Sequence, residues 1–244
     1  MSKLGIILTG QMRTYDSERI MHSYQRFLST YVPIDLFIFT WKNRGYSNNH
    51  GQPDLNNHQD YIISEYDIIS YYSQFKFITI KKIVIEDFDS FINSLPPNMK
   101  KLYHTPFRFH SITTTSIPIE YKYQQAIKYL ESIDHSKYSN IMFTRPDMEI
   151  LCDLPVQSPV NDIVYYNHCC YRCMDHCWFG STNTLIKQLS TIYDDYEKNQ
   201  NAITSSNDMN RDNNEILIYQ CSKNEIELKV KDGSFVRLIH FKDL

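Results

Sequence analysis

The chain is poor in glycine, with only six in 244 residues, whereas an average usage of about 7% would give roughly 17. None of the six lies in a GxGxxG or GxxxxGK[ST] pattern. The sequence therefore lacks both the dinucleotide-binding fingerprint and the phosphate-binding P-loop. Ordinary Rossmann dehydrogenases and P-loop kinases are excluded on this ground.

The chain also lacks a dominant charge and a long apolar run. Its 25 basic and 28 acidic side chains give a formal net charge of −3, which argues against a broad nucleic-acid-binding surface. No stretch approaches the roughly 20 apolar residues that span a bilayer, and the N-terminus shows no signal-peptide pattern. We therefore expect a cytoplasmic protein with no membrane span and no nucleic-acid partner.

Hydrophobic residues make up 42% of the chain and charged residues 22%, which is typical of a globular domain. Apolar runs at 4–9, 35–41 and 139–144 predict buried strands, because parallel strands in α/β proteins are apolar on both faces. Apolar residues at helical spacing follow the first run and fill 120–133. No linker or repeat interrupts the pattern. We predict a single α/β domain over residues 1–244, with a mostly parallel central sheet flanked by helices.

The remaining elements are assigned from the same periodicities. They are helices at 60–73, 183–197 and 213–222, and strands at 77–85, 162–166, 174–179, 227–230 and 235–241. The last two strands are predicted to form a hairpin, because Asp232 and Gly233 favour a tight turn between them. Residues 42–59 are predicted as a polar loop, and residues 95–118 are left unassigned.

Charged residues follow the strand predicted at 139–144, namely Arg145, Asp147 and Glu149. Ligands of open α/β sheets bind outside the carboxyl ends of the strands. Two carboxylates with one residue between them can share a hard divalent cation that bridges phosphates, and an arginine can donate two parallel hydrogen bonds to a pyrophosphate. A surface ion pair at the strand end is the alternative, and spacing alone does not separate the two.

Candidate ligand-binding residues also follow the first two predicted strands. They are Thr9, Gly10, Gln11 and Arg13 after the first strand, and Thr40 and Trp41 after the second. Gly10 allows a ligand to approach the backbone, and Arg13 can reach a phosphate from the adjoining helix terminus. The alternatives are a tight turn with an exposed arginine and a tryptophan of the core.

These segments together resemble a family. Six stretches carry the resemblance: Ile-Ile-Leu-Thr-Gly-Gln-Met-Arg-Thr at 6–14, Asp-Leu-Phe-Ile-Phe-Thr-Trp at 35–41, the helix bearing Gln124 and Gln125, 138–147, which ends in Thr-Arg-Pro-Asp, Asp-His-Cys-Trp-Phe-Gly-Ser at 175–181, and Asn-Glu-Ile-Leu at 214–217. They look like GT-A-fold, nucleotide-sugar-dependent glycosyltransferases of large DNA viruses and bacteria. The resemblance covers about 4–222 and implies a Rossmann-like GT-A fold.

The resemblance also implies roles for individual residues. Arg145-Pro-Asp147 takes the place of the Asp-x-Asp motif that holds Mn²⁺ or Mg²⁺ against the diphosphate. Because Arg145 replaces the first carboxylate, the arginine can partly substitute for the cation. The implied metal ligands are Asp147, Glu149 and His240. The implied nucleotide-sugar site comprises Thr9, Gly10, Gln11, Arg13, Thr40, Trp41 and Arg145.

The implied activity is that of a hexosyl- or pentosyltransferase. The expected donor is a nucleotide sugar, UDP-linked, and the expected acceptor is a hydroxyl of a carbohydrate or glycoprotein. Glu215, Asp175 and Asp212 are the candidate catalytic bases. Glu215 is favoured over Asp175 because a helix start keeps its carboxylate ionised. If the chain is viral, its expected location is the host cytoplasm, and its oligomeric state is left open.

Two other functions are considered. The first is a zinc-stabilised interaction module at 168–177, which contains His168, Cys169, Cys170, Cys173, His176 and Cys177. Zinc sites usually pair two separated knuckles, so reduced cysteines on a strand and its turn are the favoured interpretation. The second is a glycan hydrolase, which would need two carboxylates about 5 to 10 Å apart across one cleft, such as Asp147 and Glu215.

Overall fold

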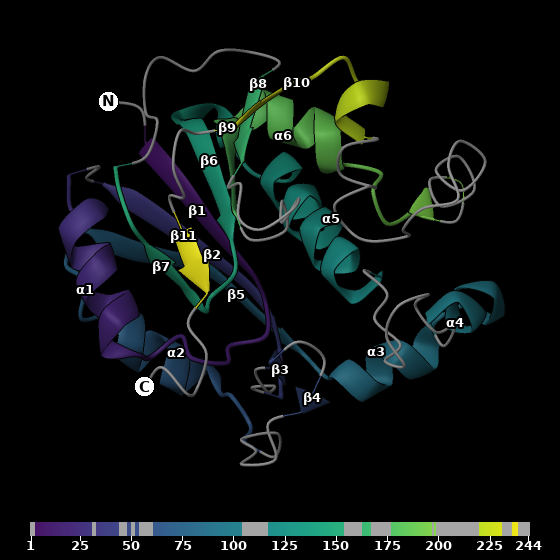
Figure 1. Ribbon diagram of the computed structural model, residues 1–244, viewed down its shortest axis with the longest axis horizontal. Helices are drawn as coiled ribbons and strands as arrows, with labels where there is room; N and C mark the ends of the chain where they lie inside the picture. The colour runs from purple at the N-terminus through teal and green to yellow at the C-terminus, as the bar shows by residue number, and fades with distance from the viewer. Residues whose placement is uncertain are drawn as a thin grey trace.

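Seven strands form one mixed sheet, with helices packed on both of its faces (Figure 1). The computed structural model describes residues 3–30, 33–43, 48–49, 52–53, 61–103, 117–153, 163–166, 177–196, 198, 220–230 and 236–238.

The sheet has the strand order β10-β8-β9-β6-β1-β2-β5. In chain order, these strands are β1 (Lys3–Gly10), β2 (Ile34–Trp41), β5 (Ile78–Glu86), β6 (Tyr138–Thr144), β8 (Ile163–Tyr166), β9 (Cys177–Ser181) and β10 (Glu227–Val230). The four neighbours β6, β1, β2 and β5 are parallel. Of the seven strands, β9 alone runs antiparallel to its neighbours, β6 and β8.

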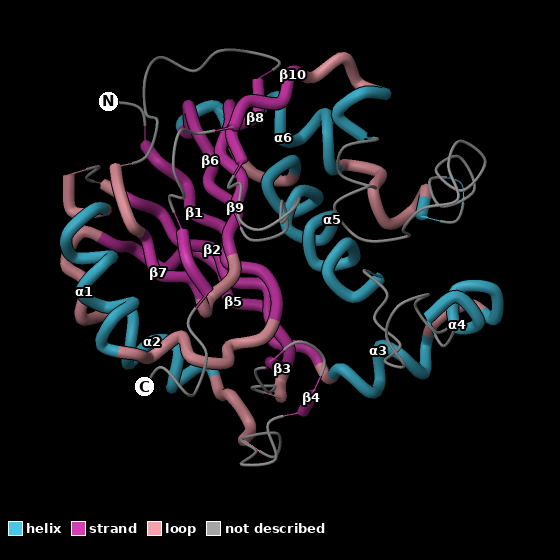
Figure 2. Tube along the Cα trace, in the orientation of Figure 1, coloured by secondary structure: helices cyan, strands magenta, loops and turns pink. Residues whose placement is uncertain are grey.

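Helices cover the sheet in two layers, with α1 and α2 on one side and α5 and α6 on the other (Figures 1 and 2). Their bounds are α1 (Glu18–Phe27), α2 (Glu65–Tyr72), α3 (Phe88–Ser94), α4 (Pro97–Tyr103), α5 (Ile117–Glu131) and α6 (Thr182–Leu189), with a short 3₁₀ helix at His135–Lys137. Two small sheets complete the described structure. They pair β3 (Asn48–Asn49) with β4 (Gln52–Pro53), and β7 (Met148–Ile150) with β11 (Val236–Leu238).

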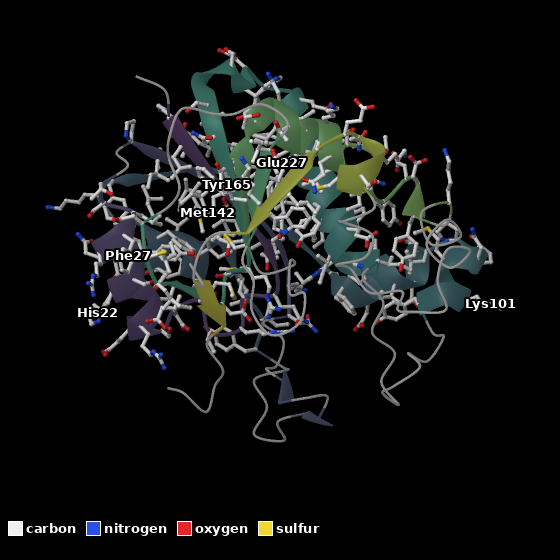
Figure 3. The ribbon with its side chains drawn as sticks, turned by 45° about the horizontal axis from the view of Figure 1, so that its top comes forward. His22, Phe27, Lys101, Met142, Tyr165 and Glu227 are labelled. Atoms are coloured by element: carbon white, nitrogen blue, oxygen red, sulfur yellow. The ribbon has the colours of Figure 1, made fainter. Side chains whose placement is uncertain are left out.

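The alternation of side chains along the strands builds two hydrophobic cores. In β2, Phe37 and Phe39 pack on the α5 side of the sheet, and Leu36 and Ile38 pack on the α1 side. All four are 1% exposed or less, and each such side chain contributes about 1.5–3 kcal/mol by its burial. Met142 of β6 is buried inside the molecule in the same way. Figure 3 shows His22 on α1 and Lys101 on α4 at opposite sides of the molecule.

Local capping explains where α1 and α2 begin. The Ser17 hydroxyl accepts a hydrogen bond from the Ile20 amide at 3.3 Å. Ser64 and Asp67 form a reciprocal capping box at the start of α2. Such caps satisfy amides that have no partner within the helix.

Among the residues that the structure describes, none of the helices combines the length and the apolar composition needed to cross a membrane.

The predicted Rossmann-like α/β class, with a mostly parallel sheet flanked by helices, is confirmed. The predicted hairpin near the C-terminus is wrong, because β10 pairs with β8 in the large sheet whereas β11 pairs with β7 in a separate one. Two helices, α3 and α4, lie at Phe88–Ser94 and Pro97–Tyr103, where no helix was predicted. The extent of one glycosyltransferase-like domain over 1–244 stays a prediction.

Candidate functional site

The carboxyl ends of four parallel strands form one edge of the sheet. Their register places Thr144 of β6 beside Leu8 of β1, and Gly10 of β1 beside Thr40 of β2. Trp41 of β2 lies beside Glu86 of β5. The segments that leave β6, β1, β2 and β5 therefore start at one shared edge, where α/β proteins bind their ligands.

Asp147 lies at this edge as a buried carboxylate bound by two arginines. Its side chain is 1% exposed. The Arg145 Nε donates to Oδ1 at 3.0 Å and the Arg145 Nη2 donates to Oδ2 at 2.7 Å, which is the two-point geometry that makes arginine–carboxylate pairs strong. The Arg13 Nη1 lies 3.6 Å from Oδ2. The structure therefore brings Arg13, Arg145 and Asp147 together, and their functional roles stay predictions.

The segment after β1 directs Arg13 toward Asp147. Gly10 has a φ of 105°, a conformation that residues with a Cβ rarely adopt. The Thr40 hydroxyl donates to the Gly10 carbonyl oxygen at 2.7 Å, which ties this turn to β2. The Gln11 Oε1 then accepts from Arg13 Nε at 3.4 Å and from Nη2 at 3.3 Å. The backbone conformation of Gly10, the contact of Thr40 with Gly10 and the hydrogen bonds to Gln11 thus orient the Arg13 side chain.

The charges of these three side chains do not cancel. Two guanidinium groups face one carboxylate, so the group carries a net positive charge. Arg13 and Arg145 remain 24% and 17% exposed, respectively. At an effective dielectric constant of 20, a unit charge about 4 Å away interacts by about 4 kcal/mol. Guanidinium groups also match the geometry of phosphate oxygens.

The predicted cation site at Asp147 and Glu149 does not fit this arrangement. Both Asp147 oxygens are bound by guanidinium groups, and a divalent cation there would lie beside two positive charges. Glu149 instead pairs with Arg19, whose Nη2 lies 3.2 Å from Oε2. Within the described residues, no group of three or more His, Cys, Asp or Glu side chains is arranged to hold a metal ion. His240 lies outside those residues, so Mn²⁺ or Mg²⁺ stays a prediction.

Three of the predicted nucleotide-binding residues are buried. The Thr9 side chain lies inside β1, and the Thr40 hydroxyl is engaged by the Gly10 carbonyl. Trp41 is 2% exposed and packs among aromatic rings, with ring-centroid distances of 5.1 Å to Phe88 and 5.0 Å to Phe91. The structure thus places Trp41 in the core, where its ring leaves no open face for stacking on a base.

The other predicted site residues fall outside the described part of the chain. They are the candidate bases Glu215, Asp175 and Asp212, and the candidate ligand His240. Of the cysteines at 168–177, the structure describes Cys177, which is buried in β9. Burial raises the pKa of the Cys177 thiol well above its usual range, whereas zinc binds the thiolate. Cys177 therefore gives the zinc interpretation no support.

One polar cluster at the edge was missed from the sequence. Glu86 ends β5, and its carboxylate accepts hydrogen bonds from Tyr121 at 3.0 Å, from Gln125 at 3.0 Å and from Lys122. The sequence contained a pattern that could have identified it, because Glu86 directly follows the strand predicted at 77–85, just as Arg145 follows the strand predicted at 139–144. Burial lowers the pKa of Lys122 to about 8.

Comparisons with known proteins give limited information. No protein-family model matches the chain, and no curated protein sequence matches it. Among solved structures, it is similar to the glycosyltransferase GlyE of Streptococcus pneumoniae TIGR4, with a TM-score of 0.45 and 7% identity. The similarity covers 95% of this chain and 46% of that one, so this chain spans less than half of the GlyE chain. At this identity and TM-score the likeness assigns no function.

Proposed function

We propose that this chain is a glycosyltransferase that moves a sugar from a nucleoside-diphosphate sugar to a hydroxyl acceptor. The observation that carries the proposal is the convergence of Arg13 and Arg145 on Asp147 at the carboxyl edge of the parallel strands. A nucleoside diphosphate that leaves during sugar transfer gains negative charge, and fixed positive groups at that position lower the barrier. The motif resemblance supports the same activity.

In the proposed reaction, the bond between the anomeric carbon of the sugar and the diphosphate oxygen breaks. Its electron pair stays on the nucleoside diphosphate, beside Arg13 and Arg145. The acceptor oxygen forms the new bond to the anomeric carbon. If the reaction inverts that carbon, a carboxylate takes the acceptor proton, and Glu215, Asp175 and Asp212 remain the predicted bases.

Positioning is the second contribution of the described residues. Asp147 is buried and binds Arg145 at two points, which restricts the rotamers of the arginine before a ligand arrives. Gln11 restrains Arg13 in the same way. A charged group that is already oriented pays little reorganisation cost when the leaving group develops its charge. The proposal includes a UDP-linked donor and a carbohydrate or glycoprotein acceptor.

The proposal is tested with purified protein and UDP-, GDP- and TDP-sugars, each with and without Mn²⁺. The readouts are release of the nucleoside diphosphate and the shift in thermal unfolding temperature. We expect Arg145→Gln to abolish both responses, because it removes the two-point contact with Asp147 and one positive charge. Arg26→Gln, on the exposed face of α1, is the matched control. Absence of any response in the wild-type protein contradicts the proposal.

A further inference from the structure

Glu86 occupies the same sheet edge as the arginine pair, three strands away. The order β6-β1-β2-β5 separates the ends of β6 and β5 by three strand spacings, or about 14 Å. The part of a nucleoside diphosphate between the ribose hydroxyls and the terminal phosphate is shorter than this, so the long arginine side chains would cover the remainder. Arg145 follows the end of β6 and Glu86 ends β5. One ligand lying across this edge can therefore reach both.

The Glu86 carboxylate is fixed in place yet accessible. Its side chain is 32% exposed, whereas Lys122, its ionic partner, is fully buried. Oε2 accepts from Lys122 and from Gln125, and Oε1 accepts from Tyr121. Since each carboxylate oxygen can accept two hydrogen bonds, Oε1 has room for one further donor. That donor would approach from the exposed side of the carboxylate.

The surroundings keep Glu86 ionised. Burial acts to raise the pKa of Glu86, but the hydrogen bond and positive charge of Lys122 and the hydrogen bonds from Tyr121 and Gln125 together outweigh it, so that the pKa lies below its usual range. Lys122 is held in turn by the Trp41 ring, whose centroid lies 4.1 Å from Nζ. An ionised, immobile acceptor suits a neutral donor such as a hydroxyl, and it repels a phosphate.

We propose that Glu86 accepts a hydrogen bond from a ribose hydroxyl of the donor nucleotide and thereby fixes the nucleoside end of the site. This inference rests on the proposed function, because it takes the diphosphate to lie at Arg13 and Arg145. The arginines and Glu86 then bind chemically different parts of the ligand. The arginines bind the charged diphosphate, and Glu86 binds the neutral sugar of the nucleoside.

The test compares ligands that share the diphosphate but differ in the nucleoside. Titration calorimetry measures the affinities of UDP, GDP and inorganic pyrophosphate for the wild-type protein and for Glu86→Gln. Hydrogen bonds to charged groups are worth enough to predict a loss of about tenfold in UDP or GDP affinity. Pyrophosphate affinity should stay within about twofold. Glu227→Gln is the matched control, because Glu227 is the first residue of β10 and so lies at the opposite end of the strands from this edge.

A double variant keeps the result interpretable, because Glu86→Gln alone leaves the buried Lys122 without its counter-charge. Glu86→Gln combined with Lys122→Met removes both charges while keeping a side chain of similar length. The same selective loss is expected in the double variant. Equal losses for pyrophosphate and the nucleotides, or no loss for either, overturn the inference. A wild-type protein that binds pyrophosphate but shows no added affinity for UDP or GDP also overturns it. If the wild-type protein binds none of the three ligands, that result instead contradicts the proposed function.

Discussion

Replacing Asp147 by asparagine tests the central contact of the proposed site. The change keeps the shape of the side chain but removes the negative charge between Arg13 and Arg145. Removing one partner of a buried ion pair costs about 3–5 kcal/mol. Since the two arginines are 24% and 17% exposed, water offsets part of that cost, and we expect a loss of about 2–4 kcal/mol. For a chain of this size that lowers the unfolding temperature by about 4–16 °C.

The assay is thermal unfolding with and without inorganic pyrophosphate. In Asp147→Asn the two guanidinium groups lose the negative charge of Asp147, and pyrophosphate can supply negative charge in its place. We therefore expect pyrophosphate to raise the unfolding temperature of the variant by more than it raises that of the wild-type protein, through the linkage between binding and stability.

Asp194→Asn is the control for this experiment. Asp194 forms an ion pair with Lys128 at 3.0 Å, but both side chains are more than half exposed, so its removal should cost less than about 1 kcal/mol. If Asp147→Asn is as stable as the wild-type protein, or gains less from pyrophosphate, then Asp147 does not hold the arginines in the way that the structure indicates.

Three further predictions concern the same edge. Gly10→Ala should lower the free energy of unfolding by about 1–2 kcal/mol in urea denaturation, because its φ of 105° strains any residue with a Cβ; unchanged stability would contradict this conformation. Trp41→Phe should destabilise the core while leaving UDP affinity within about twofold, because phenylalanine keeps an aromatic face beside Lys122; a large loss of affinity would instead support stacking of Trp41 on the base. Lys122, whose pKa is lowered to about 8 by burial, binds fewer protons in the folded state than in the unfolded state between about pH 8 and 10. Stability relative to Lys122→Met should therefore rise with pH across that window, and a flat difference would contradict the lowered pKa.

The strands of the sheet could be predicted because burial on both faces leaves a clear trace in the sequence. Ile34–Trp41 is apolar at most positions, and Tyr138–Thr144 has the apolar run Ile141–Met142–Phe143 at its centre; each strand lies between two helical layers. The same pattern located the ends of these strands to within a residue or two. It therefore indicated the edge at which Arg145 and Asp147 lie.

The partners of the charged residues could not be predicted, because tertiary packing decides them. The spacing of Asp147 and Glu149 suggested a shared cation, yet the packing of α1 against β7 brings Arg19 to Glu149 across 130 residues of sequence. The prediction of a C-terminal hairpin was wrong for the same reason. A favourable turn sequence was outweighed by the pairing of β10 with β8.

The antiparallel direction of β9 in the seven-stranded sheet has a consequence for how this fold can vary. Tyr166 of β8 pairs with Trp178 of β9, and Cys177 of β9 pairs with Thr144 of β6. The end of β8 and the start of β9 therefore lie at the same edge of the sheet as Thr144, the last residue of β6. A change in chain length between these two strand ends would therefore act beside the segment that carries Arg145, while the strand register stayed the same.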